Sequence, residues 1–203
     1  MAVHLHIDDL PDGLDLGSVV AIDTETMGLR PHRDRLCLVQ LSSGDGDAHL
    51  VKINVPMKPC PNLSALLADR NVTKLFHFGR FDLAVLGHNI VPLQGPIYCT
   101  KIASKLCRTY TDRHGLKDLC HELLKIDISK QQQSSDWGAA TLSPAQCEYA
   151  AGDVLYLHKL WERLDEMLVR EGRDALATAC FEFLETRVQL DLGGFAETDI
   201  FHH

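Results

Sequence analysis

Two acidic residues, Asp23 and Glu25, end the first strongly apolar segment of the chain, residues 19–22. Side chains two positions apart on a β-strand point to the same face, so both carboxylates would lie together. An Asp-x-Glu triplet occurs about once by chance in a chain of this size, so the spacing alone is weak evidence. Two carboxylates closing an apolar strand repel each other unless a cation lies between them, and this predicts a metal site.

A third acid, Asp82, follows a predicted strand over 74–78 and falls in the first turn of a predicted helix over 80–87. Acidic residues are favoured in first helical turns because the helix dipole is positive there. A purely structural role for Asp82 therefore remains an alternative to metal binding.

Tyr149 and Asp153 are four residues apart in a helix predicted to begin at Pro144, so they share one face of that helix. The structural alternative is a tyrosine packed on the core, with its hydroxyl bonded to the neighbouring acid. The residues around Asp153 are small and apolar, however, which predicts a half-buried carboxylate that needs a partner.

Taken together, these residues offer four carboxylates and one phenol in the order Asp-x-Glu, Asp, Tyr-x-x-x-Asp. Carboxylate oxygens suit Mg²⁺ or Mn²⁺, and several converging acids could hold two such ions. Two ions can activate a water molecule and stabilise a leaving 3′ oxygen in phosphodiester hydrolysis. The Tyr149 hydroxyl would then orient the attacking water.

The elements that must position these residues alternate in a recognisable way. Apolar and β-branched runs predict three successive strands, which suggests an antiparallel meander. A strand between two helices then argues for parallel pairing, and helices follow to the C-terminus. Ser143 and Pro144 form a helix start, with serine as N-cap and proline at the first helical position. The predicted strands are 19–24, 35–41, 49–53 and 74–78, and the predicted helices are 62–70, 80–87, 100–107, 114–124, 144–170 and 173–190.

The composition indicates one α/β domain over 1–203, with a mixed sheet and a helical C-terminal third. The chain carries 20 Lys and Arg against 28 Asp and Glu, a net charge of −8, which is unusual for a protein that grips a long polyanion. Any nucleic-acid substrate should therefore be short or be held through metal ions. Acidic residues or prolines interrupt each apolar run, and the N-terminus is unlike a signal peptide, so no membrane partner is expected. Seven unpaired-looking cysteines predict reduced thiols and a cytoplasmic location.

Over about residues 18–170 the chain resembles the DEDDy 3′-5′ exonucleases, and within them the ribonuclease D branch. The resemblance implies a ribonuclease H-like α/β fold with a mixed five-stranded sheet flanked by helices. It also implies metal ligands at Asp23, Glu25, Asp82 and Asp153, with Tyr149 positioning the water. The motifs that carry it are Val-Val-Ala-Ile-Asp-Thr-Glu-Thr at 19–26, Phe-His-Phe-Gly-Arg-Phe-Asp-Leu at 76–83, Cys-Glu-Tyr-Ala-Ala-Gly-Asp-Val-Leu-Tyr-Leu at 147–157, and the segments 114–119 and 134–137.

Ribonuclease D carries helical HRDC domains after its catalytic domain, and 203 residues leave no room for them. The segments 32–46, 130–137 and 191–195 look most like the nano-RNase C group, which clears RNA dinucleotides. That resemblance implies degradation of dinucleotides to nucleoside 5′-monophosphates by a homo-octameric ring, with DNA as a further possible substrate. The catalytic core would cover about 18–170 and a helical extension 171–203.

Further side chains could contact a substrate, each with an ordinary alternative. Thr24 lies between the first two acids, and Leu29 could wedge against a base or simply belong to an apolar loop. His77 is expected at the same end of the sheet as Asp82, where a hydrogen-bonded core histidine is the alternative. Trp137 could stack on a base, although lone tryptophans usually pack in cores.

A dinucleotidase also needs donors that bind the 5′ phosphate and so limit substrate length. Most candidates could equally be solvated surface residues, and two of them are expected to take this role. The candidates are Lys105, Arg108, His114, Lys130, Gln133, Ser134 and Ser135.

The last predicted helix carries apolar residues on more than one face. It could dock on its own domain or form an oligomer contact, and an oligomer contact is preferred. Three functions stay open: a dinucleotide-clearing exoribonuclease, a general 3′-5′ exonuclease on longer RNA or DNA, and a non-catalytic nucleic-acid-binding module. The presence of all five expected catalytic residues argues against the third.

Overall fold

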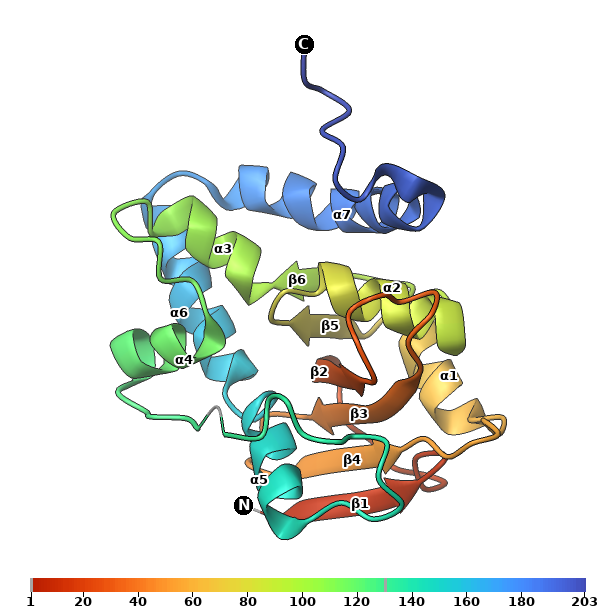
Figure 1. The fold of residues 1–203 in the computed structure, drawn as a ribbon. Coiled ribbons are helices and arrows are strands. Elements are labelled where there is room, and N and C mark those ends of the chain that lie inside the picture. The colour runs from red at the N-terminus through yellow and green to blue at the C-terminus, as the bar shows by residue number, and fades with distance from the viewer. Residues whose placement is uncertain (1, 130) are drawn as a thin grey trace.

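The computed structural model describes residues 2–129 and 131–203. Within these residues, six strands form one mixed sheet in the order β1-β4-β3-β2-β5-β6 (Figure 1). The strands are β1 (Val3–Ile7), β2 (Val19–Thr26), β3 (Leu36–Ser42), β4 (Ala48–Lys52), β5 (Thr73–Phe76) and β6 (Ile97–Cys99). The helices are α1 (Pro61–Ala68), α2 (Arg80–Asn89), α3 (Thr100–Cys107), α4 (Leu116–Leu119), α5 (Pro144–Gly152), α6 (Leu157–Arg170) and α7 (Asp174–Leu190).

The strand pairing confirms the predicted topology. β2, β3 and β4 pair antiparallel in succession, and β5 pairs parallel with β2. The sheet has six strands in the described residues, whereas five were expected. β1 pairs parallel with β4 at one edge, and the three-residue strand β6 pairs parallel with β5 at the other. β6 has only three residues, which is too short to show a period of two, so periodicity does not predict it.

The helix predicted over 144–170 is wrong as a single element, because the structure has two helices there. α5 ends at Gly152, and α6 begins only at Leu157. Glycine weakens a helix interior, and this break leaves Asp153 at the C-cap of α5 rather than inside a helix. The helix predicted over 114–124 likewise becomes the short α4 followed by a π-helical turn, Cys120–Leu124.

The start of α5 is fixed by the residues that the sequence indicated. Ser143 Oγ accepts a hydrogen bond from Gln146 N at 3.2 Å, and Gln146 Oε1 accepts one from Ser143 N at 2.9 Å. The Gln146 side chain also donates to the carbonyl of Asp136 at 3.1 Å. This capping box therefore ties the helix that leads to Tyr149 and Asp153 to the loop before it.

Helices cover the sheet on both sides. α5 contacts β1, β3 and β4, α6 contacts β5, and α2 contacts β2 and β3. In Figure 1, α1 and α2 lie to the right of the sheet, whereas α5 and α6 lie to the left. None of the helices in the described ranges is long and apolar enough to cross a bilayer.

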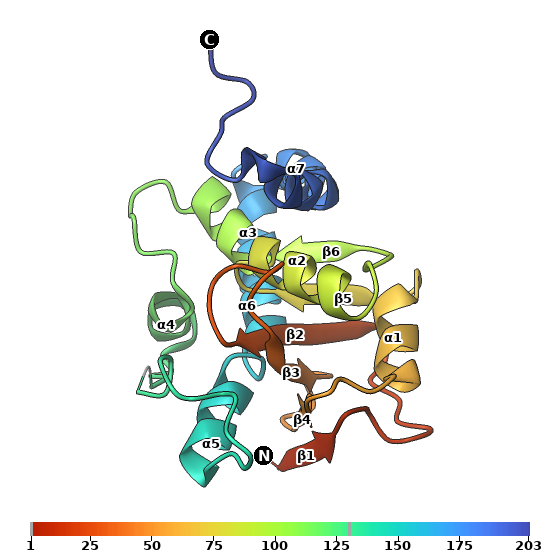
Figure 2. The ribbon, with the colours of Figure 1, turned by 45° about the vertical axis from the view of Figure 1, so that its right-hand side comes forward.

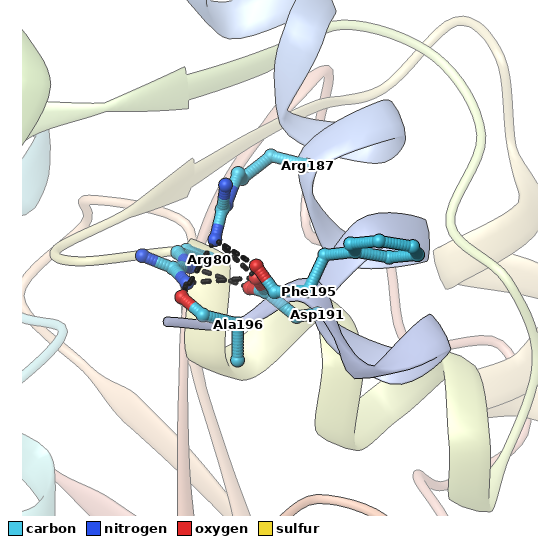
Figure 3. A network of polar contacts seen from close by, with 5 residues as sticks. All are labelled: Arg80, Arg187, Asp191, Phe195 and Ala196. Carbon is cyan, nitrogen blue, oxygen red and sulfur yellow. Dashed lines mark hydrogen bonds and ion pairs between the residues drawn. The ribbon is translucent and has the colours of Figure 1, made fainter. Parts of the chain in front are cut away.

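The C-terminal helix α7 packs across α2, α3 and β6, so it does dock on its own domain. Figure 2 shows α7 beyond β6, with the final segment extending away from the sheet. Just after α7, the Asp191 carboxylate accepts hydrogen bonds from Arg80 Nη2 at 2.7 Å and lies 2.8 Å from Arg187 Nη2 (Figure 3). Both guanidinium groups also donate to the carbonyl of Ala196, at 3.0 and 2.8 Å. These contacts join the C-terminal extension to the first turn of α2.

Candidate active site

The central strand β2 carries the first two acids. Asp23 lies opposite Gln40 and Glu25 opposite Leu38 on the neighbouring strand β3. The break after α5 brings Asp153 to the same place, and ligand oxygens of Asp23, Glu25 and Asp153 all lie within 4.8 Å of one another. Three predicted metal ligands from two distant parts of the sequence therefore converge.

Asp82 lies in the first turn of α2, as predicted, and is buried. Its Oδ1 accepts a 2.6 Å hydrogen bond from Thr24 Oγ1. Asp82 is not one of the three acids whose oxygens lie within 4.8 Å of one another, but after burial its charge also raises the pKa of Asp23 and of Asp153. The Thr24 hydroxyl therefore positions Asp82 beside the cluster.

The four acids occupy an unfavourable environment for negative charge. Burial, and then repulsion from Asp153 and Asp82, raises the pKa of Glu25 from 4.5 to about 9. Burial raises the pKa of Asp82 and of Asp153 from 3.8 to about 7, and repulsion from Asp82 adds to the effect on Asp153. The pKa of Asp23 lies well above its ordinary value for the same two reasons, burial first. A divalent cation would relieve this repulsion, so the donor set fits a metal ion that prefers oxygen ligands.

Gln40 is a site residue that the sequence reading missed. Its side chain is fully buried on β3, and Nε2 donates to Asp23 Oδ2 at 3.0 Å. The available signal was a glutamine within a buried strand whose other residues, apart from the terminal Ser42, are apolar. Because an amide N–H bonds the charged form of a carboxylate, Gln40 orients Asp23.

Tyr149 lies on α5, one turn before Asp153, and its ring is tilted against that of Trp137 with centroids 6.0 Å apart. Burial, and then the charges of Asp153, Glu25 and Asp23, raises the pKa of the Tyr149 phenol above its usual range. The phenol therefore stays protonated at neutral pH, so it can donate a hydrogen bond.

Around the acids lies a cleft of about 680 Å³. Leu29 is 84% exposed at this cleft, whereas Trp137 is only 3% exposed and packs against Cys37, Leu38 and Leu50. Most of the Trp137 side chain thus belongs to a small core, although one edge borders the cleft. The predicted residues that line the cleft are Asp23, Glu25, Tyr149 and Asp153 together with Thr24, Leu29, His77, Gln133, Ser134, Ser135 and Trp137.

Other predicted phosphate-binding residues lie elsewhere. Arg108 is fully buried, where it donates to Arg113 O at 2.8 Å and pairs with Glu122. This burial contradicts the prediction that Arg108 contacts substrate, because its guanidinium is used within the fold. His114 bonds Ser104 Oγ at 2.8 Å and is outside the cleft lining. Lys105 borders a neighbouring groove instead, and Lys130 lies outside the described residues.

The cleft also has residues that the sequence reading did not single out. Phe78 is 47% exposed, and Lys101 Nζ lies 4.2 Å from its ring centroid. Both side chains line the cleft, as do Phe81 and Lys117. The signal for Phe78 is its position directly after His77 in the second motif, within the predicted strand over 74–78.

The chain is similar in sequence to a known protein family and to curated proteins of two bacteria. A family model described as 3′-5′ exonuclease matches residues 8–169. Ribonuclease D of Gluconacetobacter diazotrophicus is 36% identical over 154 residues, which are 76% of this chain and 39% of that protein. Ribonuclease D of Escherichia coli K12 is 32% identical over 146 residues, 71% of this chain and 38% of that protein. The chain thus spans about two fifths of the length of these curated relatives.

Solved structures extend the similarity to the whole chain. Brucella melitensis NrnC with bound Mg²⁺ is 58% identical with a TM-score of 0.95, and 100% of each chain is covered. Brucella melitensis NrnC bound to pGG is 59% identical with a TM-score of 0.96, covering 100% of this chain and 99% of that one. Escherichia coli RNase D is 28% identical with a TM-score of 0.75, covering 85% of this chain and 45% of that one.

Proposed function

The chain belongs to the 3′-5′ exonuclease family, and we propose that it is a metal-dependent exoribonuclease that degrades RNA dinucleotides to nucleoside 5′-monophosphates. The observation that carries this proposal is the convergence of Asp23, Glu25 and Asp153, whose ligand oxygens lie within 4.8 Å at a substrate-sized cleft. Clefts of roughly 300–1,000 Å³ are typical of small-ligand sites.

Asp23, Glu25 and Asp153 would hold the metal, with Asp82 beside them. Two divalent ions, Mg²⁺ or Mn²⁺, would supply an activated water and positive charge at the leaving oxygen. The Tyr149 hydroxyl, kept protonated by its surroundings, orients that water by hydrogen bonding. Gln40 and Thr24 hold the carboxylates of Asp23 and Asp82 in place at 3.0 and 2.6 Å.

A dinucleotide preference is supported by three facts. Brucella melitensis NrnC, which is similar over its whole length, was solved with pGG. The net charge of −8 does not suit a long polyanion. The polar side chains of Gln133, Ser134 and Ser135 line the same cleft and can donate to a terminal phosphate.

The assembly that we propose is a homo-octameric ring, as in the nano-RNase C group. The outer face of α7 is consistent with a contact between copies, since Leu176 and Phe183 remain exposed there. Size-exclusion chromatography with light scattering tests this state, and a monomer would contradict it. A cytoplasmic location is part of the same proposal, because all seven cysteines are free in the described structure.

The experiment that tests the function is hydrolysis of 5′-labelled RNAs of about two to seven nucleotides, with Mg²⁺, with Mn²⁺ and with EDTA. We expect the dinucleotide to be cleaved much faster than longer RNAs, and EDTA to stop cleavage. Similar metal-dependent rates at every length would instead indicate a general 3′-5′ exonuclease. No hydrolysis at any length would leave a nucleic-acid-binding module.

A further inference from the structure

His77 follows β5 and lines the cleft, and one of its two ring nitrogens is hydrogen-bonded within the fold. Its Nδ1 lies 2.9 Å from Thr100 Oγ1, and that hydroxyl donates to the carbonyl of Phe76 at 3.1 Å. A threonine hydroxyl has one proton to donate. Because the proton is used on Phe76, the contact with His77 requires Nδ1 to be the donor. The opposite ring nitrogen, Nε2, then carries a free lone pair.

The surroundings keep this tautomer neutral. Burial, and then the nearby ammonium of Lys101, lowers the pKa of His77 to about 3. Nε2 is not among the buried side-chain atoms of the described residues that lack a hydrogen-bond partner. Since His77 lines the cleft, its Nε2 is open to whatever the cleft binds.

An unprotonated imidazole nitrogen accepts hydrogen bonds and cannot donate one. It therefore does not bind a phosphate oxygen, which is itself an acceptor. It recognises a donor, and the donors that every RNA end offers, whatever its base, are the 2′ and 3′ hydroxyls of the terminal ribose. The acids that would hold the scissile phosphate line the same cleft as His77, so the terminal sugar lies within reach.

We propose that His77 Nε2 accepts a hydrogen bond from a ribose hydroxyl of the 3′-terminal nucleotide. This inference rests on the proposed function and assigns His77 to recognition of the sugar rather than of phosphate. A contact with the 2′ hydroxyl would favour RNA over DNA, and a contact with the 3′ hydroxyl would favour a free 3′ end.

The test compares kcat/KM for three dinucleotides in the wild type and in His77→Ala. One dinucleotide is unmodified, one lacks the 2′ hydroxyl of the 3′-terminal nucleotide, and one lacks its 3′ hydroxyl. Removal of the contacted hydroxyl should cost the wild type about three- to tenfold, the usual effect of one neutral hydrogen bond. His77→Ala should show no such loss for that hydroxyl. The ratio of two substrates in one variant does not depend on how much of the protein is folded.

Two further variants sharpen this comparison. His77→Gln keeps an acceptor oxygen and should restore part of the discrimination, which a purely structural role would not predict. His88→Ala removes an exposed histidine from α2 and should discriminate as the wild type does.

If removal of the 2′ hydroxyl and of the 3′ hydroxyl lowered kcat/KM equally in the wild type and in His77→Ala, the proposed contact would be overturned. This holds even if the dinucleotide preference is correct. RNAs of every length could be cleaved, while the ratio of kcat/KM with and without the contacted ribose hydroxyl still depends on His77. That result would support the contact and refute the dinucleotide preference. Absence of hydrolysis of every RNA would refute both.

Discussion

Burial of the carboxylates of Asp23, Glu25 and Asp153, and then repulsion from neighbouring acids, dominates the site at the scale of single residues. Each carboxylate is at least partly removed from water, and each lies close to others of the same charge. Such a cluster is held together by the surrounding fold at a cost to stability. A bound divalent cation would offset this loss of stability and would supply positive charge for catalysis. The same acids would therefore account both for the instability of the metal-free site and for its chemistry.

The metal-free protein should therefore lose stability as pH rises. Glu25 has an ordinary pKa of 4.5 and a folded-state pKa of about 9, so the folded chain binds this proton more tightly than the unfolded chain. Its stabilising contribution is present below its ordinary pKa and is lost as pH rises through its folded-state pKa. Asp82 and Asp153 lose theirs as pH rises through about 7.

Thermal unfolding in EDTA measures this effect. Tm should fall between about pH 5 and pH 9, and Mg²⁺ should restore it most at the alkaline end, where protons no longer compete for the carboxylates. Asp199→Asn, which removes an exposed carboxylate near the C-terminus, should leave the slope unchanged. A metal-free Tm that is constant or rises over this range would contradict the raised pKa values that burial and repulsion give these acids.

Tyr149→Phe removes only the hydroxyl that we propose orients the attacking water. We expect kcat to fall about a hundredfold, the usual effect of losing one well-placed donor, while the Mg²⁺ requirement stays the same. Single-turnover hydrolysis across a Mg²⁺ series separates the two quantities. A large rise in the Mg²⁺ requirement would instead make Tyr149 part of the metal site.

Gln40→Leu removes the amide that orients Asp23. Loss of such a supporting contact commonly weakens metal affinity by about 10- to 100-fold, so the Mg²⁺ concentration for half-maximal activity should rise by that factor. Val39→Ala is a suitable control, because it destabilises the same buried strand without touching Asp23. If both variants shifted the Mg²⁺ dependence equally, the effect would be general destabilisation.

At the scale of elements, the C-terminal half of β2 and the break between α5 and α6 place the acid cluster. The antiparallel meander and the parallel pairing of β5 could be predicted from the periodicity and order of the elements. The start of α5 could be predicted from Ser143 and Pro144. The break at Gly152 could not, because the apolar period continues across it and only tertiary packing decides the outcome. Arg108 was misassigned for a related reason, since no local pattern shows that a guanidinium is buried against Glu122.

The C-terminal extension is joined to α2 through the contact between Asp191 and Arg80. Arg80 precedes Asp82 by two residues at the start of that helix. Asp191→Asn should weaken this contact, leave two guanidinium groups without their carboxylate (Figure 3), and lower stability by about 1–3 kcal/mol. Amide hydrogen exchange should quicken after residue 190 and at the start of α2. Unchanged exchange in both segments would show that α7 packing alone holds the extension.

At the scale of the whole molecule, a chain with net charge −8 presents an acidic cleft to an anionic substrate. This combination is workable when metal ions supply the positive charge at the phosphate and when the substrate has few phosphates. The fold family and the acidic motif could be predicted from sequence because four ordered motifs fix both. Substrate length could not be predicted from the residues alone, since no local pattern shows that Gln133, Ser134 and Ser135 line the same cleft as the acids.

The most direct test of the central claim measures Mg²⁺ binding by calorimetry and dinucleotide hydrolysis on the same samples of wild type, Asp23→Asn and Asp153→Asn. Each substitution should abolish measurable Mg²⁺ binding or weaken it strongly, and should lower kcat by at least about a thousandfold. Glu182→Gln, an exposed change on α7, should match the wild type in both. Near-normal hydrolysis by either aspartate variant would contradict metal-dependent catalysis at this cluster.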